Sequence, residues 1–165
     1  MDNKYPVIRT VLRRALLTSI VLLVGVVAGG QMGLFAGKRP TDLGVHEGRL
    51  KAAPTTPNCV NSQSDSGYSR IAPLAYSGDG KRALARLPAI IAAMPSGKLI
   101  DFRADYLYAE FTSKLFGFVD DIEFYLDEKA GVIHVRSASR IGHGDRGVNR
   151  QRVEAIREAF GKGPA

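Results

Sequence analysis

The chain has 165 residues, 45% of them hydrophobic and 24% charged, so it has room for one domain of ordinary size with accessory segments, but not for a second core. The formal net charge of +7 first suggests a nucleic-acid binder. The first forty residues, however, hold six Lys or Arg against one acid, and the remainder holds 17 against 15. A nearly balanced domain lacks the basic face that neutralises phosphates, so nucleic acid is not an expected partner.

An uncharged apolar run occupies residues 15–37 and follows a basic segment, residues 1–14, with four Lys or Arg. About twenty apolar residues let a helix cross a bilayer, so the run predicts a single transmembrane anchor. A cleaved signal peptide is the alternative, because the most apolar part, residues 16–28, is short and Ala28-Gly29-Gly30 resembles a cleavage site. Lys and Arg are enriched on the cytoplasmic side of a membrane. The basic segment is therefore expected in the cytoplasm, with the bulk of the chain facing outward.

Residues 38–67 have a different character. They contain Pro40, Pro54 and Pro57 and a polar stretch, without apolar periodicity. Such a composition predicts a linker and an extended arm, and Val60, flanked by turn-forming residues, would suit a loop docked on the domain. Cys59 is the only cysteine, so no internal disulfide can form.

Residues 68–165 are predicted to form the soluble domain. A helical pattern covers residues 84–94, after a capping Asp79, and Pro88 within it predicts a kink or two short helices. Residues 98–112 alternate as one or two strands, with a bend at Asp105. Residues 121–127 and 132–138 alternate on either side of a short turn, which is typical of a hairpin.

The last element is the clearest helix, from residue 148 to 160. Val148, Val153, Ile156 and Phe160 are predicted to form its inward stripe. The expected fold is therefore α+β. An antiparallel meander sheet of about three to four strands packs against two helices, preceded by one N-terminal transmembrane helix.

Acids, arginines, hydroxyls and glycines are unusually dense in residues 118–124 and 135–154. These two stretches, preceded in the chain by residues 57–62 and 71–74, closely resemble the uncharacterised family called domain of unknown function 1499. The resemblance covers residues 54–160. The resemblance implies a bacterial envelope protein, with relatives in plastids, and no accepted activity. With the anchor, it predicts a single-pass protein of the bacterial inner membrane whose domain faces the periplasm. A cleaved secreted form is the alternative.

An anion site is one interpretation of this signature. The arginines supply charge, and the glycine-rich loop at residues 142–147 can expose backbone amides at the start of the last helix. A carboxylate, a phosphate or a lipid headgroup would suit it. The candidate ligand-binding residues are Arg136, Arg140, His143, Asp145, Arg146, Asn149 and Arg150.

A structural network is the second interpretation, in which arginine forks pair with carboxylates and fix the sheet on the helix. Its candidate members are Asp120, Asp121, Glu123, Arg136, Ser137 and Ser139. Both interpretations bring arginines and acids together beside the opening turn of the last helix.

Metal-dependent hydrolysis in the envelope is the alternative function, with Asp120, Asp121, Glu123 and His143 as ligands or catalytic groups. On a strand, however, Asp120 faces away from Asp121 and Glu123, and no known metal motif is present. No Gly-x-Ser-x-Gly turn presents a nucleophile. We therefore expect a binding or assembly module rather than an enzyme, without a metal or cofactor, and the sequence does not specify a protein partner.

Overall fold

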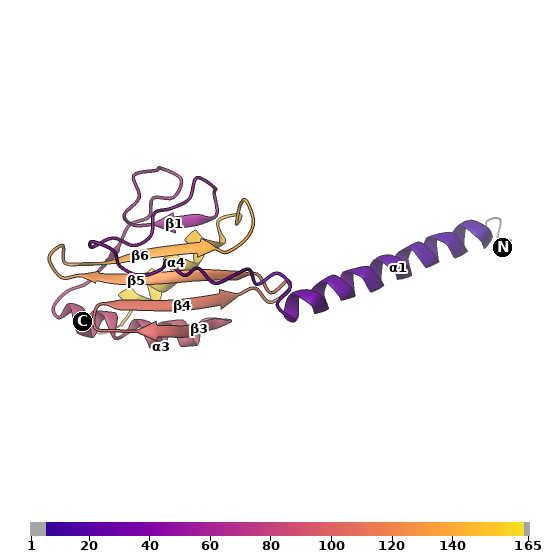
Figure 1. Cartoon of the computed structure of the whole chain (residues 1–165). Coiled ribbons are helices and arrows are strands. Elements are labelled where there is room, and N and C mark those ends of the chain that lie inside the picture. Colours follow the sequence, from indigo (N-terminus) through magenta and orange to yellow (C-terminus); the bar gives the residue numbers. More distant parts are fainter. Residues whose placement is uncertain (1–5, 164–165) are drawn as a thin grey trace.

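The computed structural model describes residues 6–163 (Figure 1). A long helix, α1 (Pro6–Gln31), projects from one end of an α+β domain. Its segment Val7–Gln31 is long and apolar enough to cross a membrane, and its most apolar window is not covered by the domain. The helix begins earlier than the predicted span of residues 15–37. It also ends earlier, because Gly33 and Gly37 adopt left-handed backbone conformations, with φ of 90° and 68°.

The domain contains one antiparallel sheet of six strands in the spatial order β1-β6-β5-β4-β3, with β2 also paired to β6. The antiparallel sheet is confirmed, but the prediction of three to four strands was too low. The two additional strands contain three and two residues, too few to show alternation. The strands are β1 (Cys59–Asn61), β2 (Leu74–Ala75), β3 (Gly97–Phe102), β4 (Tyr106–Thr112), β5 (Val119–Asp127) and β6 (Val132–Ser139).

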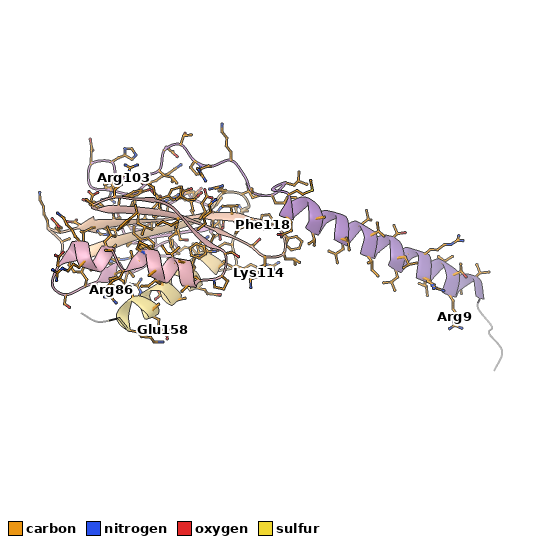
Figure 2. The ribbon with its side chains drawn as sticks, turned by 90° about the horizontal axis from the view of Figure 1, so that it is seen from below. Arg9, Arg86, Arg103, Lys114, Phe118 and Glu158 are labelled. Carbon is orange, nitrogen blue, oxygen red and sulfur yellow. The ribbon has the colours of Figure 1, made fainter. Side chains whose placement is uncertain are left out.

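Helices α2 (Gly80–Leu84), α3 (Leu87–Ala93) and α4 (Val148–Gly161) pack on one face of the sheet (Figures 1 and 2). Asp79 caps α2 by accepting hydrogen bonds from the backbone N–H groups of Lys81 and Arg82, at 2.8 and 3.1 Å. Pro88 lies in the first turn of α3, where its missing N–H costs no helical hydrogen bond. The predicted interruption is therefore a break between two short helices.

The main core lies between these helices and the sheet. Because side chains alternate along a strand, every second residue of β4, β5 and β6 enters this core. Val148 was predicted to face inward but is 45% exposed, since it lies in the first turn of α4, beyond the edge of the core. The core side chains are Val60, Ile71, Leu74, Ala83, Leu84, Leu87, Ile91, Leu107, Ala109, Phe111, Ile122, Phe124, Leu126, Ile133, Val135, Val153, Ile156 and Phe160.

The other face of the sheet is covered by the chain that follows α1. We call residues 38–56 the arm; it runs along the sheet without forming a helix or a long strand (Figure 1). Leu50 of the arm is buried against Tyr106 and Tyr108 of β4. The sheet is thus enclosed between helices and the arm, and polar side chains that point away from the helices are also shielded from water.

Candidate functional site

Strand alternation separates the polar signature into two clusters on opposite faces of the sheet. On β5, Asp121 and Glu123 point toward the arm, whereas Asp120 points toward the helices. We call the first group the arm-side cluster and the second the helix-side cluster. The arm-side cluster contains Arg39, Tyr106, Tyr108, Glu110, Asp121, Glu123, Arg136 and Arg140. The helix-side cluster contains Asp120, Ser137, Ser139, Asn149 and Arg152.

Glu123 lies at the centre of the arm-side cluster and is completely buried. Its Oε1 accepts hydrogen bonds from the Tyr106 hydroxyl at 2.9 Å and from the Gly44 backbone N–H of the arm at 2.8 Å. Its Oε2 accepts a hydrogen bond from Arg136 Nη1 at 3.3 Å. One carboxylate therefore joins β4, β6 and the arm.

Arg140 connects two further acids of the same cluster. Its Nη2 and Nε donate to the Asp121 carboxylate at 2.7 and 3.0 Å, and Nη2 also donates to Glu110. Arg39 of the arm donates to Glu110 Oε1 at 2.6 Å. Burial alone would raise the pKa of Glu110, but the hydrogen bonds from Arg39, Arg140 and Tyr108 outweigh it and lower this pKa to about 2.

A cavity of about 420 Å³ lies between the arm and the end of β6. Arg136, Arg140, Asp121 and Lys51 contribute its charged lining. The Arg136 side chain is only 6% exposed, and its Nε is the one buried side-chain N or O atom among the described residues that lacks a hydrogen-bond partner. A buried donor without an acceptor is rare and calls for a partner. The remaining lining residues are Pro40, Ala52, Pro54, Thr56, Asn58, Ala138, Ser139, Ile141 and Gly142.

The helix-side cluster is closed and fully satisfied. Asn149 is completely buried; its Oδ1 accepts hydrogen bonds from the Ser137 hydroxyl at 2.5 Å and from Arg152 Nη1 at 2.8 Å. Its Nδ2 donates to the Asn58 carbonyl and the Ser139 hydroxyl. Arg152 Nη2 also lies 2.6 Å from Asp120 Oδ2. This cluster fixes α4 on the sheet, and none of its buried side-chain N or O atoms lacks a hydrogen-bond partner.

The backbone N–H groups at the start of α4 are bonded by the carboxylate of Asp145, which lies just before the helix. Asp145 accepts hydrogen bonds from the backbone N–H groups of Gly147 and Asn149, both at 2.9 Å. Burial raises the pKa of Asp145, but these backbone hydrogen bonds outweigh it and hold the pKa below its ordinary value. The Gly147 and Asn149 amides at the start of α4 are thus not free for an anion.

The other predicted ligand-binding residues are separated. Arg150 donates to the backbone carbonyls of Tyr68 and Arg70, at 2.7 and 2.9 Å, whereas His143 and Arg146 are exposed on the loop. Arg136 and Arg140 lie on the arm side of the sheet. The structure therefore brings together two of the four candidate arginines, and it places them in the arm-side cavity rather than at the helix start.

The residues of the predicted hydrolase are not assembled either. Asp120 lies on the opposite face of the sheet from Asp121 and Glu123, and His143 is exposed on the loop that follows β6. Within residues 6–163, no group of three or more His, Cys, Asp and Glu side chains is arranged to hold a metal ion. Nothing in this geometry favours the hydrolase.

His134 lies in a row with Ser62 and Asp127. Its Nδ1 lies 3.1 Å from Ser62 Oγ, and its Nε2 lies 3.8 Å from Asp127 Oδ2, too far for a hydrogen bond. Ser62 Oγ also accepts the Val135 backbone N–H at 2.9 Å, so it closes the edge of the sheet rather than presenting a nucleophile. The ring stacks on Tyr125.

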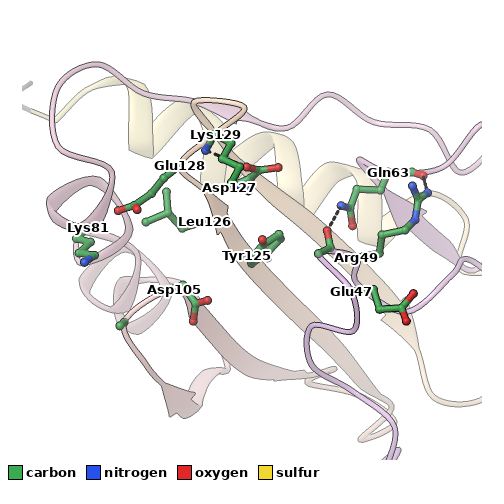
Figure 3. Close-up of a pocket in the computed structure, with 12 residues that line it drawn as sticks. Glu47, Arg49, Gln63, Lys81, Asp105, Tyr125, Leu126, Asp127, Glu128 and Lys129 are labelled. Atoms are coloured by element: carbon green, nitrogen blue, oxygen red, sulfur yellow. Dashed lines mark hydrogen bonds between the residues drawn. The ribbon is translucent and has the colours of Figure 1, made fainter.

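A hollow of about 980 Å³ lies beside this row at the end of the sheet that carries the β5–β6 turn (Figure 3). Acids and bases alternate around it, among them Glu47, Arg49, Asp105 and Lys129. None of the ligand-binding residues predicted from the sequence lines it, and its mixed charge favours no class of ligand.

Sequence reasoning missed four members of the arm-side cluster, Arg39, Tyr106, Tyr108 and Glu110, and one member of the helix-side cluster, Arg152. Arg152 falls three residues after Asn149, the spacing at which helical side chains meet, so periodicity could have found it. Glu110 and Tyr108 share a strand face, which alternation could have indicated. No local pattern marked Arg39, because it lies in an irregular segment and its partner Glu110 is 71 positions away in the sequence.

Comparison with known proteins gives one match. The family model described as protein of unknown function (DUF1499) matches residues 49–160, close to the resemblance seen in the sequence. No curated protein and no solved structure gives a significant match. Since the matched region covers more than half of the chain, this protein belongs to the DUF1499 family.

Proposed function

We propose that this protein is a membrane-anchored module of the cell envelope that binds an anionic group, a phosphate or a carboxylate, in the arm-side cavity. The observation that carries the proposal is Arg136, a buried guanidinium that lines the cavity with its Nε unpartnered. A buried donor of this kind costs free energy unless something accepts its hydrogen bond. An anion in the cavity would remove this cost.

The size and charge of the cavity fit such a ligand. Cavities of roughly 300 to 1,000 Å³ hold small molecules, and this one, at about 420 Å³, is near the lower end. Guanidinium groups bind carboxylates and phosphates through paired hydrogen bonds. Lys51 adds a cation at the rim; its side chain is 38% exposed and lies 2.7 Å from Asp42.

An uncleaved α1 is part of the proposal. Ala28-Gly29-Gly30, the sequence that resembles a cleavage site, lies inside the helix, and Gly30 is buried against the domain. Proteases act mainly on exposed, flexible segments. We infer that α1 remains as the anchor, with the domain on the periplasmic side of the bacterial inner membrane. The intact mass of the purified protein distinguishes this form from a cleaved secreted one.

Thermal unfolding of the full chain in detergent micelles tests the proposed binding. Inorganic phosphate should raise the unfolding temperature above that in chloride at equal ionic strength, because a ligand that binds only the folded state stabilises it. The Arg136→Met/Glu123→Gln variant removes a charged pair together and should lose this shift. The matched control, Arg152→Met/Asp120→Asn, removes a pair on the other face and should keep it.

The binding proposal fails if phosphate gives no more stabilisation than chloride, or if the Arg136→Met/Glu123→Gln variant keeps the shift. Should that variant not fold, Lys51→Ala serves instead, since it removes a half-exposed cation and should weaken the shift. The source of the anion is a separate comparison. Stabilisation by phosphate indicates a free ligand, whereas stabilisation only by phosphatidylglycerol added to the micelles indicates a lipid headgroup.

A further inference from the structure

We propose that the end of the domain next to α1 makes a second membrane contact, in addition to α1 itself, and that this contact fixes the orientation of the domain on the bilayer. This inference rests on the proposed anchoring by α1. The contact surface combines the exit of α1 with the β4–β5 loop, residues 113–118. We call it the junction surface and define it by its exposed apolar side chains, Met32, Leu34, Leu115 and Phe118.

The loop is docked rigidly on the end of α1. Gln31 Nε2 donates to the backbone carbonyls of Lys114 and Leu115, at 2.7 and 3.2 Å. The backbones of Gly30 and Gly117 are so close that a Cβ built on Gly117 would lie 2.1 Å from the Gly30 carbonyl oxygen. A Cβ on Gly30 would lie 2.3 Å from the Phe116 carbonyl oxygen. The loop must therefore follow wherever the helix end lies.

Apolar side chains continue from the helix onto the domain at this point. Met32, Leu34 and Leu115 are 89%, 72% and 55% exposed. Phe118 is 40% exposed, and its ring packs on Phe35 and Phe116 with centroids 5.6 and 5.9 Å apart. Figure 2 shows Phe118 and Lys114 beside the end of α1, while Glu158 lies on the helices of the domain. The junction surface is thus continuous with the apolar surface of α1.

The length of α1 places this surface at the bilayer interface. Its 26 residues span about 39 Å at 1.5 Å per residue, and the hydrocarbon core is about 30 Å thick. Both ends of a spanning helix therefore reach the headgroup region. Aromatic rings and the apolar stems of lysines are favoured there. Phe118 and Phe35 supply the rings, and the exposed Lys114 supplies such a stem, so a bilayer suits the surface better than a protein partner.

Fluorescence quenching in vesicles tests this contact with the full chain. The native Cys59 is buried, and burial raises its pKa to about 11, so it should not compete for a thiol-reactive dye. Single cysteines are introduced by Leu115→Cys on the junction surface, by Leu22→Cys within α1, and by Lys129→Cys at the β5–β6 turn. The vesicles contain phosphatidylcholine and phosphatidylglycerol, with a spin-labelled phosphatidylcholine as quencher.

Lys129 is the matched control because it is exposed and lies at the other end of the nine-residue strand β5, about 30 Å away at 3.3 Å per residue. The proposal predicts quenching at positions 22 and 115 that is at least threefold stronger than at position 129. Quenching at 22 with equal, weak quenching at 115 and 129 overturns the membrane contact and leaves the anchor in place. Weak quenching at all three positions overturns the anchor and the contact together.

Discussion

Two arginines show how position decides what the same residue type does. Arg136 and Arg152 each pair with a carboxylate across neighbouring elements, at 3.3 and 2.6 Å. Arg152 also donates to Asn149 inside a closed cluster. Arg136 contributes to the lining of a cavity, and its buried Nε has no hydrogen-bond partner. The proposed binding site therefore lies on the arm side of the sheet, although both residues belong to the same signature in the sequence.

Asn149 should be the most sensitive residue of the helix-side cluster. Asn149→Ala removes four hydrogen bonds and leaves the Ser137 hydroxyl buried, so we expect it to lower the free energy of unfolding by about 2–3 kcal/mol. Urea denaturation measures this loss. Ser139→Ala removes only one of these hydrogen bonds and should cost about 1 kcal/mol. Equal losses in the two variants would contradict the role of Asn149 as the centre of the cluster.

Glu123 and Arg136 should depend on each other for stability. Arg136→Met alone leaves the completely buried Glu123 without its counter-ion and should cost about 3–5 kcal/mol. Arg136→Met combined with Glu123→Gln should cost clearly less, because no uncompensated charge remains. A double-mutant cycle in urea measures the coupling. Additive losses would show that the two side chains do not interact in the folded protein.

At the scale of elements, α1 and the β4–β5 loop act as one unit, and glycine makes this possible. Gly117 combines a φ of 67° with its close approach to the Gly30 carbonyl. Gly131 has nearly the same φ, 65°, but open space where a Cβ would stand. Comparing alanine at the two positions therefore separates backbone strain, which both share, from the clash, which only Gly117→Ala suffers.

Gly131→Ala should cost about 1 kcal/mol of stability and leave the junction intact. Gly117→Ala should cost more and release the loop from α1. Thermal unfolding reports the stability, and hydrogen exchange at the Ser113 and Phe118 amides, which are hydrogen-bonded within the loop, reports the junction. Similar exchange rates in both variants would show that the loop is not held by the contact with Gly30.

How well each element could be predicted depended on its regularity. The β5–β6 hairpin, α4 and the two short helices were predicted because alternation, helical spacing and the Asp79 cap are local signals. The arm was predicted only as an extended segment, and β1 only as part of a docked loop, since their order comes from distant contacts such as Gly44 with Glu123. Because the position of the arm on the sheet was not predicted, the sequence could not indicate that the arm covers the acids on the outer face of β5. The cavity was therefore not predicted.

At the scale of the whole molecule, Glu110 and His134 are two largely buried titratable groups that make stability depend on pH. Hydrogen bonds lower the pKa of Glu110 from its ordinary 4.5 to about 2 against the effect of burial. The unfolded chain then binds this proton more readily than the folded one, so the contribution is present above about pH 4.5 and is lost as pH falls toward 2. Glu110→Gln should flatten the acid limb of the stability curve, and an unchanged limb would contradict this assignment.

His134 should make the stability depend on pH near neutrality. Burial lowers its pKa below the ordinary 6.5, with only partial opposition from Asp127. The unfolded chain therefore gains this proton at a higher pH, so stability is fully present above about pH 6.5 and decreases as pH falls below it. His134→Gln should remove this slope, measured by urea denaturation between roughly pH 5 and 7. A slope that persists in the variant would assign it to other groups.

The Arg136 Nε–H resonance tests the central claim most directly. In ¹H–¹⁵N spectra of the full chain in detergent micelles, titration with inorganic phosphate should shift this resonance strongly, because a hydrogen bond forms where the structure has none. The Arg152 resonance, on the other face of the sheet, should stay in place. If Arg136 does not respond to phosphate, or if both arginines shift alike, the arm-side cavity is not the anion site.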